Sequence, residues 1–406
     1  MKILHVIAQL PMKTGSGVYF TSVIDGLKEY KEVNQAAIYA TTKDYSVNFL
    51  EEKNLYEVEF ESKNIPFSIV GMSDTMPYKN TLYSEMTEQM FEIWQKNFYK
   101  ILKKAKKEFN PDIVITHHLW ILSSMVCDIF YDKKIYGICH NTDIRQALKN
   151  KDIKEKYVTN LKQLKKIFAL SNDVINEIEE IYGYDKKNII DFGAGYNEKI
   201  FYPLENYPKK EKIELIYAGK FSESKGFYEF IKSCNILQEK YDNISVDIIG
   251  NLTCENRAKI KELNLNIKNI NIYNTLNQKE LANILRKKDI FVLPSYFEGL
   301  GLIAVEALGS GVFVVSSEIK GLIEFLGEEI NSNNVIEYVK LPKIYDTDKA
   351  VEEEKPEFVK RLVKKIELQI RRVKTKRKFD KEILSLLQKH SWKNKISELY
   401  TIIKNK

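Results

Sequence analysis

The chain has 406 residues, of which 44% are hydrophobic and 29% charged, with 17 Gly, 9 Pro and 4 Cys. This length predicts two or three domains, the apolar fraction excludes a disordered chain, and the low Gly and Pro content excludes a fibrous protein. The net charge of +7 is concentrated between residues 360 and 378, where ten basic residues and one acidic residue give +9 and leave −2 for the rest. This distribution is not typical of a nucleic-acid-binding protein, so no nucleic-acid partner is expected.

Two further features of the sequence bear on its location. No stretch reaches the ~18 uninterrupted apolar residues of a membrane span, and the first nine residues are too short an apolar run for a secretion signal. The cysteines are scattered without a Cys-x-x-Cys pair, at Cys127, Cys139, Cys234 and Cys254. We therefore expect a cytoplasmic protein with buried free thiols, and neither a disulfide framework nor a zinc site.

The first half of the sequence alternates short apolar runs with amphipathic segments, which is the pattern of a parallel sheet covered on both faces by helices. A long helix is predicted over 84–108, and it ends before Asn110-Pro111 because proline cannot continue a helix. The predicted strands of this half are 2–8, 35–39, 112–116, 134–139 and 166–170.

A second series of strands begins after a Pro- and Lys-containing segment at 202–212. Its predicted strands are 213–218, 245–249, 270–273, 290–293 and 312–316. The two series predict an α/β protein with two doubly wound Rossmann-like domains, 1–205 and 206–390, facing a central cleft at the carboxyl ends of their strands.

The loop after the first strand contains Thr14-Gly15-Ser16-Gly17 and opens a helical run. Glycines let the backbone approach a ligand, and a helix N-terminus favours an anion. A tight strand-to-helix turn without a ligand explains this pattern equally well.

In the second half, Gly219-Lys220 and Lys225-Gly226 stand between a predicted strand and a predicted helix. Two ammonium groups five residues apart on such a loop could hold a diphosphate. The alternative is a solvated turn in a chain that is rich in lysine.

The strongest local pattern runs from Pro294 to Gly309, where a buried strand ends, a glycine-rich turn follows and an apolar helix begins. Glu306, about two turns into this helix, lies among apolar residues, and a carboxylate is rarely buried without a partner. We expect its partner to be a ribose diol or a sugar, or else a structural Arg or a backbone amide. Glu298, eight residues earlier, is expected to point into the cleft, and Gly299 and Gly301 leave backbone N–H groups for phosphate.

These three segments, together with Gly193-Ala194-Gly195-Tyr196-Asn197 and Phe201-Tyr202-Pro203, resemble the retaining glycosyltransferases of family 4 and occur in the family's order over nearly the whole chain. The resemblance implies the GT-B fold. It also implies that Glu306 binds the nucleotide ribose, that Glu298 contacts the donor sugar, and that both lysines contact the donor diphosphate. The family usually has Arg at the position of Lys220, so the bidentate guanidinium fork is lost there.

The histidines extend this resemblance. His140 ends a predicted strand and is similar to the family's strand-end histidine, which lies against the donor sugar. His117 and His118 end the neighbouring strand, in a turn similar to the family's His-rich turn. The alternative for each is a structural histidine. Asp143 and Arg145 follow in the same loop and could face the acceptor.

The expected site falls into three groups. The expected catalytic residues are His140, Glu298, Lys220 and Lys225. The expected donor-binding residues are Gly15, Ser16, Gly17, Gly219, Gly299, Leu300, Gly301, Leu302 and Glu306. The expected acceptor-side residues are His117, His118, Asp143 and Arg145.

The basic segment near the C-terminus has two interpretations. Apolar residues recur at helical spacing from Phe358 to Val373, which indicates either packing against the protein with a solvated charged face, or peripheral contact of 358–378 with the inner face of an anionic membrane. The last amphipathic helix, 391–406, is similar to the family's closing helix, which packs back on the N-terminal domain.

The sequence therefore predicts a glycosyltransferase that moves a sugar from a nucleotide diphosphate sugar to a hydroxyl of a glycan, a lipid-linked sugar or another glycoconjugate, with anomeric configuration retained. Lysines and backbone amides would stabilise the departing diphosphate, with no metal and no other cofactor. One alternative is a GT-B sugar-nucleotide epimerase, against which the spacing of the two glutamates argues. The other is an inactive glycosyltransferase-like partner subunit, although such subunits tend to lose the lysines and glutamates found here.

Overall fold

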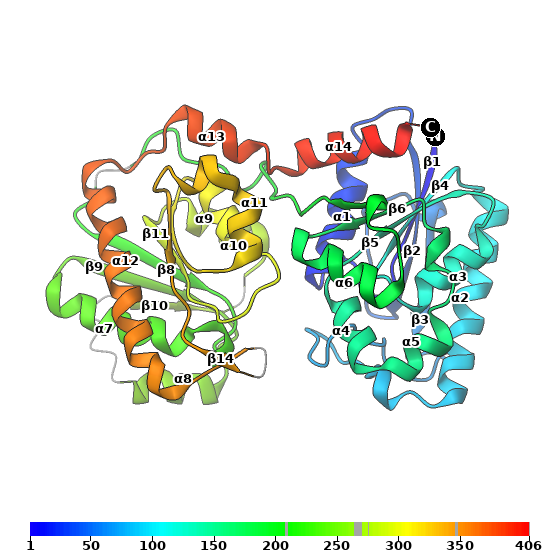
Figure 1. Cartoon of the computed structure of the whole chain (residues 1–406), viewed down its shortest axis with the longest axis horizontal. Coiled ribbons are helices and arrows are strands. Elements are labelled where there is room, and N and C mark those ends of the chain that lie inside the picture. The colour runs from blue at the N-terminus through cyan, green and yellow to red at the C-terminus, as the bar shows by residue number, and fades with distance from the viewer. Residues whose placement is uncertain (208–209, 264–269, 275, 346–347, 406) are drawn as a thin grey trace. The chain divides into compact units, whose positions relative to one another are not determined.

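The computed structural model describes residues 1–207, 210–263, 270–274, 276–345 and 348–405, and the chain forms two compact units (Figure 1). Unit 1 comprises 1–194 and 396–406, and unit 2 comprises 195–395. The sequence placed this division at 205–206. The division by contacts lies earlier because Tyr196 and Phe201 are buried in the core of unit 2. Of the predicted connecting segment, residues 208–209 lie outside the described residues.

Unit 1 is built on a parallel sheet in the order β3-β2-β1-β4-β5-β6-β7, so the direction of winding reverses between β1 and β4. Its strands are β1 (Lys2–Val6), β2 (Asn34–Thr42), β3 (Leu55–Phe60), β4 (Ile113–His117), β5 (Lys134–Ile138), β6 (Lys166–Ala169) and β7 (Ile189–Asp191). Its helices are α1 (Gly15–Leu27), α2 (Glu88–Glu108), α3 (Ile121–Ile129), α4 (Thr142–Lys149), α5 (Lys151–Tyr157), α6 (Asn172–Tyr182) and most of α14 (Trp392–Lys404).

The apolar runs of unit 1 are continuous because both faces of the sheet are buried. In β2, Ala36 and Ile38 belong to one hydrophobic cluster, whereas Ala37 and Tyr39 belong to another cluster on the opposite face. Helix α2 begins four residues later than predicted. The side chain of Thr87 accepts a hydrogen bond from a backbone amide of the first turn and caps the helix there.

Unit 2 has a second parallel sheet, in the order β10-β9-β8-β11-β12-β13, whose winding reverses between β8 and β11. Its strands are β8 (Ile213–Ala218), β9 (Ile244–Ile249), β10 (Ile270–Tyr273), β11 (Ile290–Leu293), β12 (Phe313–Ser317), β13 (Ile336–Val339) and a separate antiparallel pair, β14 (Ile344–Tyr345) and β15 (Lys349–Ala350). Its helices are α7 (Phe227–Lys240), α8 (Cys254–Glu262), α9 (Gln278–Leu285), α10 (Leu302–Gly309), α11 (Lys320–Asn331), α12 (Lys355–Thr375) and α13 (Lys381–Gln388).

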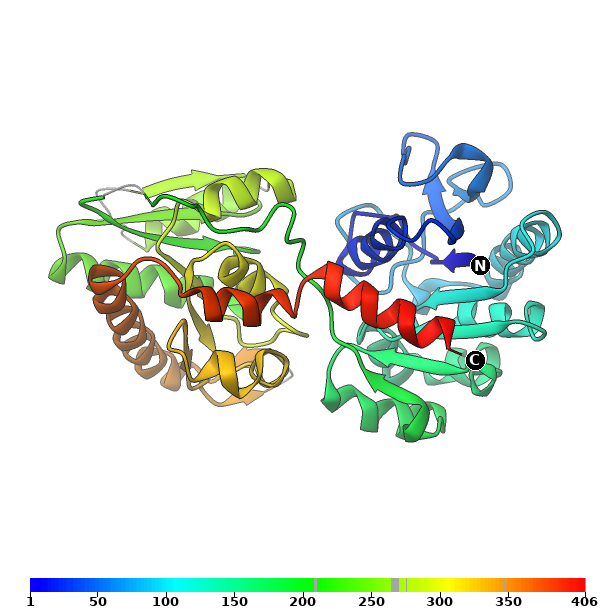
Figure 2. The ribbon, with the colours of Figure 1, turned by 90° about the horizontal axis from the view of Figure 1, so that it is seen from above.

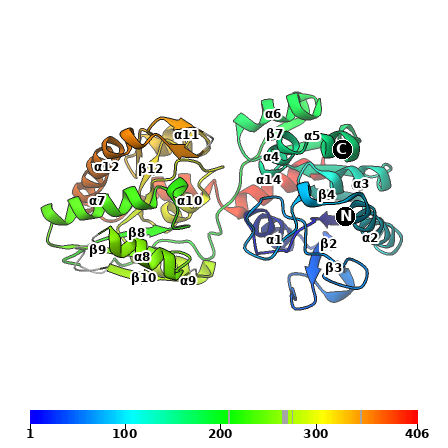
Figure 3. The same cartoon turned by 90° about the horizontal axis from the view of Figure 1, so that it is seen from below.

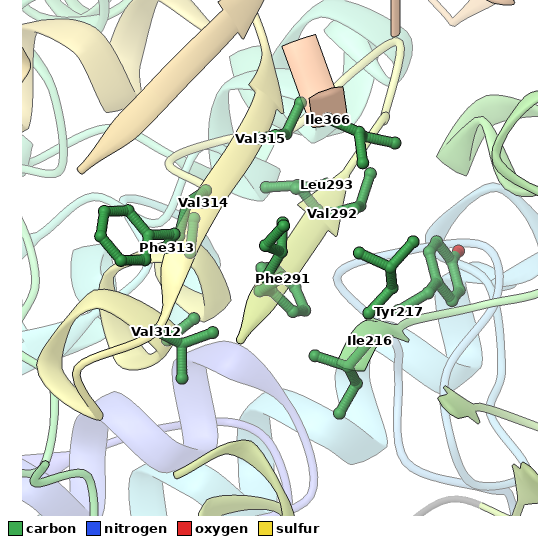
Figure 4. Packing of buried hydrophobic residues seen from close by; sticks show 14 of the residues in the cluster. Ile216, Tyr217, Phe291, Val292, Leu293, Val312, Phe313, Val314, Val315 and Ile366 are labelled. Carbon is green, nitrogen blue, oxygen red and sulfur yellow. The ribbon is translucent and has the colours of Figure 1, made fainter. Parts of the chain in front are cut away.

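Helices cover both faces of this second sheet (Figure 3). Helices α7 and α12 pack against each other over one face, and α10 packs with α9 and α13 over the other. The central strands β11 and β12 supply the apolar side chains between these layers, among them Val292 and Val314 (Figure 4). Both units are therefore doubly wound α/β structures, and the predicted fold class is confirmed in each.

The basic segment near the C-terminus forms α12 and uses its apolar stripe for packing. Phe358, Leu362 and Ile366 are fully buried against the sheet, which agrees with the packing interpretation. Lys365 and Arg372 form ion pairs with Glu337 of β13 at 2.6 Å each. Contact of this segment with a membrane stays a prediction. Among the described residues, no helix is both long and apolar enough to cross a membrane.

All four cysteines are free thiols, as predicted. Cys127, Cys139 and Cys234 are buried, whereas Cys254 is exposed because it begins the surface helix α8. The prediction of burial was therefore wrong for Cys254.

Helix α14 returns the chain to unit 1, where both termini lie (Figure 2). A Cβ built on Gly26 of α1 would lie 2.4 Å from Cγ1 of Ile396, so the absence of a side chain at Gly26 lets the two helices approach closely. Further along, the rings of Tyr30 and Tyr400 stack at 3.9 Å, and the hydroxyl of Tyr400 donates a hydrogen bond to Glu32.

Candidate active site

Two loops of unit 2 start where the sheet reverses its winding. Strands β8 and β11 are paired neighbours, and the loops that follow them, 219–226 and 294–301, leave the same carboxyl edge of the sheet. In doubly wound sheets this is the position at which ligands bind. The lysine loop and the glutamate element predicted from the sequence are therefore adjacent in the structure.

Backbone contacts join these two loops. The amide of Tyr296 donates to the carbonyl of Ser224 at 2.9 Å. Gly226 has a φ of +60°, and a Cβ at this position would lie 2.0 Å from the carbonyl oxygen of Pro294. Only glycine satisfies both the left-handed backbone and this close approach, so Gly226 fixes the spacing of the loops.

Lys225 and Glu298 meet across the two loops. The ammonium of Lys225 lies 2.9 Å from Oε1 of Glu298 and 3.3 Å from the carbonyl oxygen of Phe297. The hydroxyl of Ser295 donates to the same Oε1 at 2.9 Å. The sequence analysis did not predict the role of Ser295. Its hydroxyl, three residues before Glu298, was the feature that could have indicated this hydrogen bond. The charge of Glu298 is thus balanced within the protein, with both side chains about a quarter exposed.

Lys220 is arranged differently. Its backbone is held by the hydroxyl of Tyr217, which donates to the Lys220 carbonyl at 2.6 Å, while its side chain is exposed. Among the described residues, no carboxylate pairs with its ammonium. The amide of Gly219 donates to Ile249 and is not available to a ligand. Lys220 therefore presents an uncompensated positive charge at the carboxyl edge of the sheet.

Glu306 is the fifth residue of α10, so it lies about one turn into the helix and not two as predicted. It is 8% exposed, between the fully buried residues Val305 and Ala307. Within the described part of the chain, no cation and no hydrogen-bond donor contacts its carboxylate, so neither a structural Arg nor a backbone amide is its partner. Burial raises the pKa of this carboxyl group to about 8. The acceptor oxygens of Glu306 are thus left for a ligand.

The turn before α10 supplies backbone donors. Gly301, with a φ of 71°, is the N-cap of the helix, and Leu302 is its first residue. The amides of Gly299, Leu300 and Gly301 make no backbone hydrogen bond among the residues described. Such N–H groups at a helix N-terminus favour an anion.

A buried lysine supports the loop that carries Lys225. Lys355 begins α12, with a side chain 8% exposed, and its ammonium lies 2.6 Å from Glu223 of the short 3-10 turn 223–225. It also pairs with Glu352. Sequence reasoning missed this contact. The available signal was a cation at a helix N-terminus, where the helix dipole disfavours positive charge.

In unit 1, three imidazoles gather at the ends of β4 and β5. Nδ1 of His117 lies 3.0 Å from Nε2 of His140, and the ring of His118 lies 4.8 Å from that of His140. All three are buried, and burial lowers the pKa of each well below its usual range, to about 3 for His118. They are therefore neutral at pH 7 and can exchange hydrogen bonds with a ligand or with each other.

The predicted role of Asp143 toward the acceptor requires an accessible carboxylate, but this side chain is buried. It is fully buried, and its carboxylate accepts hydrogen bonds from the backbone amides of Leu119 at 2.7 Å and His140 at 3.1 Å. It fastens the end of β5 to the loop after β4 and so positions the histidines. Arg145 is exposed on α4.

The glycine segment after β1 forms the first turn of α1. The side chain of Thr14 caps the helix and accepts the amide of Gly17 at 3.0 Å, so this amide is used within the protein. A Cβ at Gly17 would lie 2.6 Å from the carbonyl oxygen of Leu10, whereas a Cβ at Gly15 would meet nothing within 4 Å. Gly17 is thus required by packing, and the space beside Gly15 is open to a ligand. The hydroxyl of Ser16 donates to Gln9.

No group of three or more His, Cys, Asp or Glu side chains among the described residues is arranged to hold a metal ion. The expectation that the reaction needs no metal stays a prediction.

The sequence is similar to known glycosyltransferases. The family described as "Glycosyl transferases group 1" matches residues 202–341, which include both loops of the candidate site in unit 2. An uncharacterised glycosyltransferase of Methanocaldococcus jannaschii is 30% identical over 313 residues, which cover 70% of this chain and 75% of that protein.

Solved structures resemble the chain over its whole length. A glycosyltransferase from Rickettsia africae has a TM-score of 0.68 at 16% identity and covers 100% of this chain and 99% of its own. The Anabaena protein HepE, solved with UDP and glucose, has a TM-score of 0.65 at 12% identity and covers 99% of both chains. This likeness confirms the predicted GT-B fold class.

Proposed function

The chain belongs to the group 1 glycosyltransferases, and from this membership we propose that it transfers a sugar from a nucleotide diphosphate sugar to an acceptor hydroxyl with retention of anomeric configuration, as family 4 enzymes do. The acceptor we propose is a glycan or a lipid-linked sugar. The HepE neighbour, whose structure holds UDP and glucose, supports a nucleotide-sugar donor.

The observation that carries this proposal is the chemistry gathered at one sheet edge of unit 2. Glu306 offers buried acceptor oxygens that lack a partner in the described protein, which suits the two hydroxyls of a ribose. The exposed ammonium of Lys220 and the N-terminus of α10 offer positive charge and amides, which suit a diphosphate. A nucleoside diphosphate carries both groups in one molecule.

In the proposed reaction, the bond from the anomeric carbon to the diphosphate breaks while a bond from the acceptor oxygen to that carbon forms on the same face of the sugar, which retains the configuration. The acceptor hydroxyl passes its proton to the departing diphosphate oxygen, and Lys220, Lys225 and the amides before α10 stabilise the negative charge that develops on the diphosphate. Fixed charges of this kind lower the barrier without reorganising during the reaction. Lys225 also holds Glu298, so we assign Glu298 to the transferred sugar beside the diphosphate.

The residues of unit 1 take the complementary roles in this proposal. His140 and the open helix start at Gly15 and Ser16 are assigned to the donor side, and His117, His118 and Arg145 to the acceptor side. Asp143 is assigned to positioning because its carboxylate is bound to backbone amides.

A panel of nucleotide sugars tests the donor. We expect the matching donor to raise the melting temperature and to be slowly hydrolysed, and NMR of the product with a suitable acceptor should show the donor's anomeric configuration. The inverted configuration would contradict retention. Conversion of the nucleotide sugar to its epimer without an acceptor would instead support an epimerase, and binding without any turnover would support an inactive partner subunit.

A further inference from the structure

Outside the candidate active site, unit 2 contains a cavity of about 350 Å³. It opens where the end of α12 and the start of α13 meet the sheet. Pockets that hold small molecules typically span ~300–1,000 Å³, so this one lies at the lower end of that range.

The cavity lies at the opposite edge of the sheet from the donor loops. Phe313 is the first residue of β12 and Val335 immediately precedes β13, and both line the cavity. It is therefore at the amino ends of parallel strands, whereas loops 219–226 and 294–301 follow the carboxyl ends. A molecule bound here would be a second ligand and not part of the donor.

The floor of the cavity is apolar. Phe313 and Phe379 meet edge to face with ring centroids 4.9 Å apart, and Ile383 of α13 lies beside them. Each of the three keeps 5–7% of its surface exposed, so the floor is reachable but largely dry. Such a surface favours an apolar or aromatic group.

The rim of the cavity is cationic. Arg371, Lys376 and Lys378 are exposed there. Lys376 pairs with Asp380 at 2.5 Å, and the ammonium of Lys378 donates to a backbone carbonyl at 3.0 Å. Among the residues described, no carboxylate pairs with Arg371. Arg372 also lines the cavity, but Glu337 balances its charge. Asp380 against Arg371, Lys376 and Lys378 therefore leaves the described rim with a net positive charge, which an anion would balance.

We propose that this cavity binds a small amphipathic anion, whose apolar body rests on Phe313, Phe379 and Ile383 and whose anionic group meets Arg371 and Lys378. The net positive charge of the rim repels a cationic ligand and gives a neutral ligand no electrostatic attraction. The volume of about 350 Å³ limits the apolar body to a few rings or a short alkyl chain.

The probe for this proposal is 8-anilinonaphthalene-1-sulfonate, an aromatic anion whose fluorescence rises in apolar surroundings. We expect one saturable site on the full chain, and much weaker binding of N-phenyl-1-naphthylamine, which lacks the sulfonate. Octyl phosphate should displace the probe, and inorganic phosphate at the same concentration should not. Equal displacement of the probe by inorganic phosphate would overturn the proposal. A protein that binds anionic vesicles but shows no saturable binding of the probe would also overturn it.

Two variants locate the site. The double variant Arg371→Ser with Lys378→Ser should weaken probe binding by about an order of magnitude, since each exposed ion pair is worth up to ~5-fold. Thr375→Trp keeps every charge but fills the cavity, so the site should be lost.

The matched control is Lys360→Ser with Lys364→Ser, which removes two exposed charges from α12 outside the cavity. Circular dichroism melts establish that each variant is folded. Unchanged binding in both cavity variants, or equal loss in the control, would refute the assigned location.

Discussion

At the scale of single residues, Glu306 combines burial with the absence of a described partner. Its raised pKa of about 8 means that the free protein holds this carboxyl group protonated at pH 7. Ribose hydroxyls that donate to the carboxylate would favour its ionised form and lower the pKa. Binding of the donor should therefore be coupled to the release of a proton.

The first prediction tests this coupling by calorimetry of the nucleoside diphosphate in buffers of different ionisation enthalpy. At pH 7 the wild type should release up to one proton per molecule bound, and at pH 9.5, above the raised pKa, almost none. Glu306→Gln should release none at either pH and should bind about 10- to 150-fold more weakly, because a hydrogen bond to a charged group contributes ~1.5–3 kcal/mol. If proton release persists in Glu306→Gln, the proton comes from a group other than Glu306.

The second prediction concerns the pair of Lys225 and Glu298. Glu298→Ala frees the ammonium of Lys225, so binding of the nucleoside diphosphate should be unchanged or slightly tighter, while sugar transfer collapses. Ser295→Ala removes one hydrogen bond but keeps both charges, and should reduce transfer less. Calorimetry measures binding of the nucleoside diphosphate, and transfer rates measure the reaction, so the two together test whether Glu298 acts on the sugar alone. Full activity in Glu298→Ala would remove this residue from the site.

The sequence predicted the glutamates and lysines because each departs from its local pattern: a carboxylate in an apolar helix, or cations in a loop after a strand. It could not predict that Asp143 is bound to the backbone, because one partner, Leu119, is 24 residues away. It also left open whether Glu306 has a structural partner, since that depends on which side chains tertiary packing brings near.

At the scale of elements, the start of α12 supports the lysine loop through Lys355. The third prediction is that Lys355→Met, which keeps the buried stem, raises the donor KM and lowers kcat, because Glu223 no longer anchors the turn that carries Lys225. The loss of stability should be at most about 2 kcal/mol, since two partly exposed pairs are lost.

The control for Lys355→Met is Lys360→Met, whose partner Glu357 lies on the same helix. A melting-temperature loss with an unchanged donor KM would show that Lys355 serves stability alone.

The ends of β4 and β5 make unit 1 sensitive to acid. The pKa of His118 is about 3 in the folded protein and near 6.5 when unfolded, so the unfolded state binds more protons below pH 6.5. The fourth prediction is that the stability of unit 1 falls as the pH drops from 7 to 5.

His118→Asn should make this fall shallower, and asparagine tolerates the positive φ of 67° at this position. Denaturant unfolding followed by the fluorescence of Trp94 and Trp120 measures it. An unchanged pH slope in the variant would place the acid sensitivity elsewhere.

Strands buried on both faces could be predicted from the sequence, because their apolar runs are continuous. The edge strand β3 alternates buried and exposed residues and was not predicted. Strand β13 was also missed, since Glu337 interrupts its apolar run. Its compensating partners, Lys365 and Arg372, come from α12 and cannot be identified before the fold is known.

At the scale of the whole molecule, unit 1 depends on a helix from the far end of the chain. The fifth prediction is that Gly26→Ala destabilises unit 1 by about 1–3 kcal/mol, because its Cβ would lie 2.4 Å from Ile396. Adding Ile396→Ala should recover part of this loss, which a double-mutant cycle measures.

Gly15→Ala, where a Cβ meets open space, is the matched control for stability. Hydrogen exchange of the α1 amides reports on the unit directly. Equal protection in Gly26→Ala and the wild type would show that the docking of α14 does not stabilise α1.

The docking of α14 also has a consequence for biosynthesis. Unit 1 is interrupted in the sequence by 195–395, so its closing helix is synthesised 201 residues after the rest of it. At ~5–20 residues per second this corresponds to a delay of roughly 10–40 s on the ribosome. Throughout that interval the face of α1 around Gly26 is uncovered, and a nascent chain at this stage offers chaperones an apolar surface that the finished enzyme no longer has.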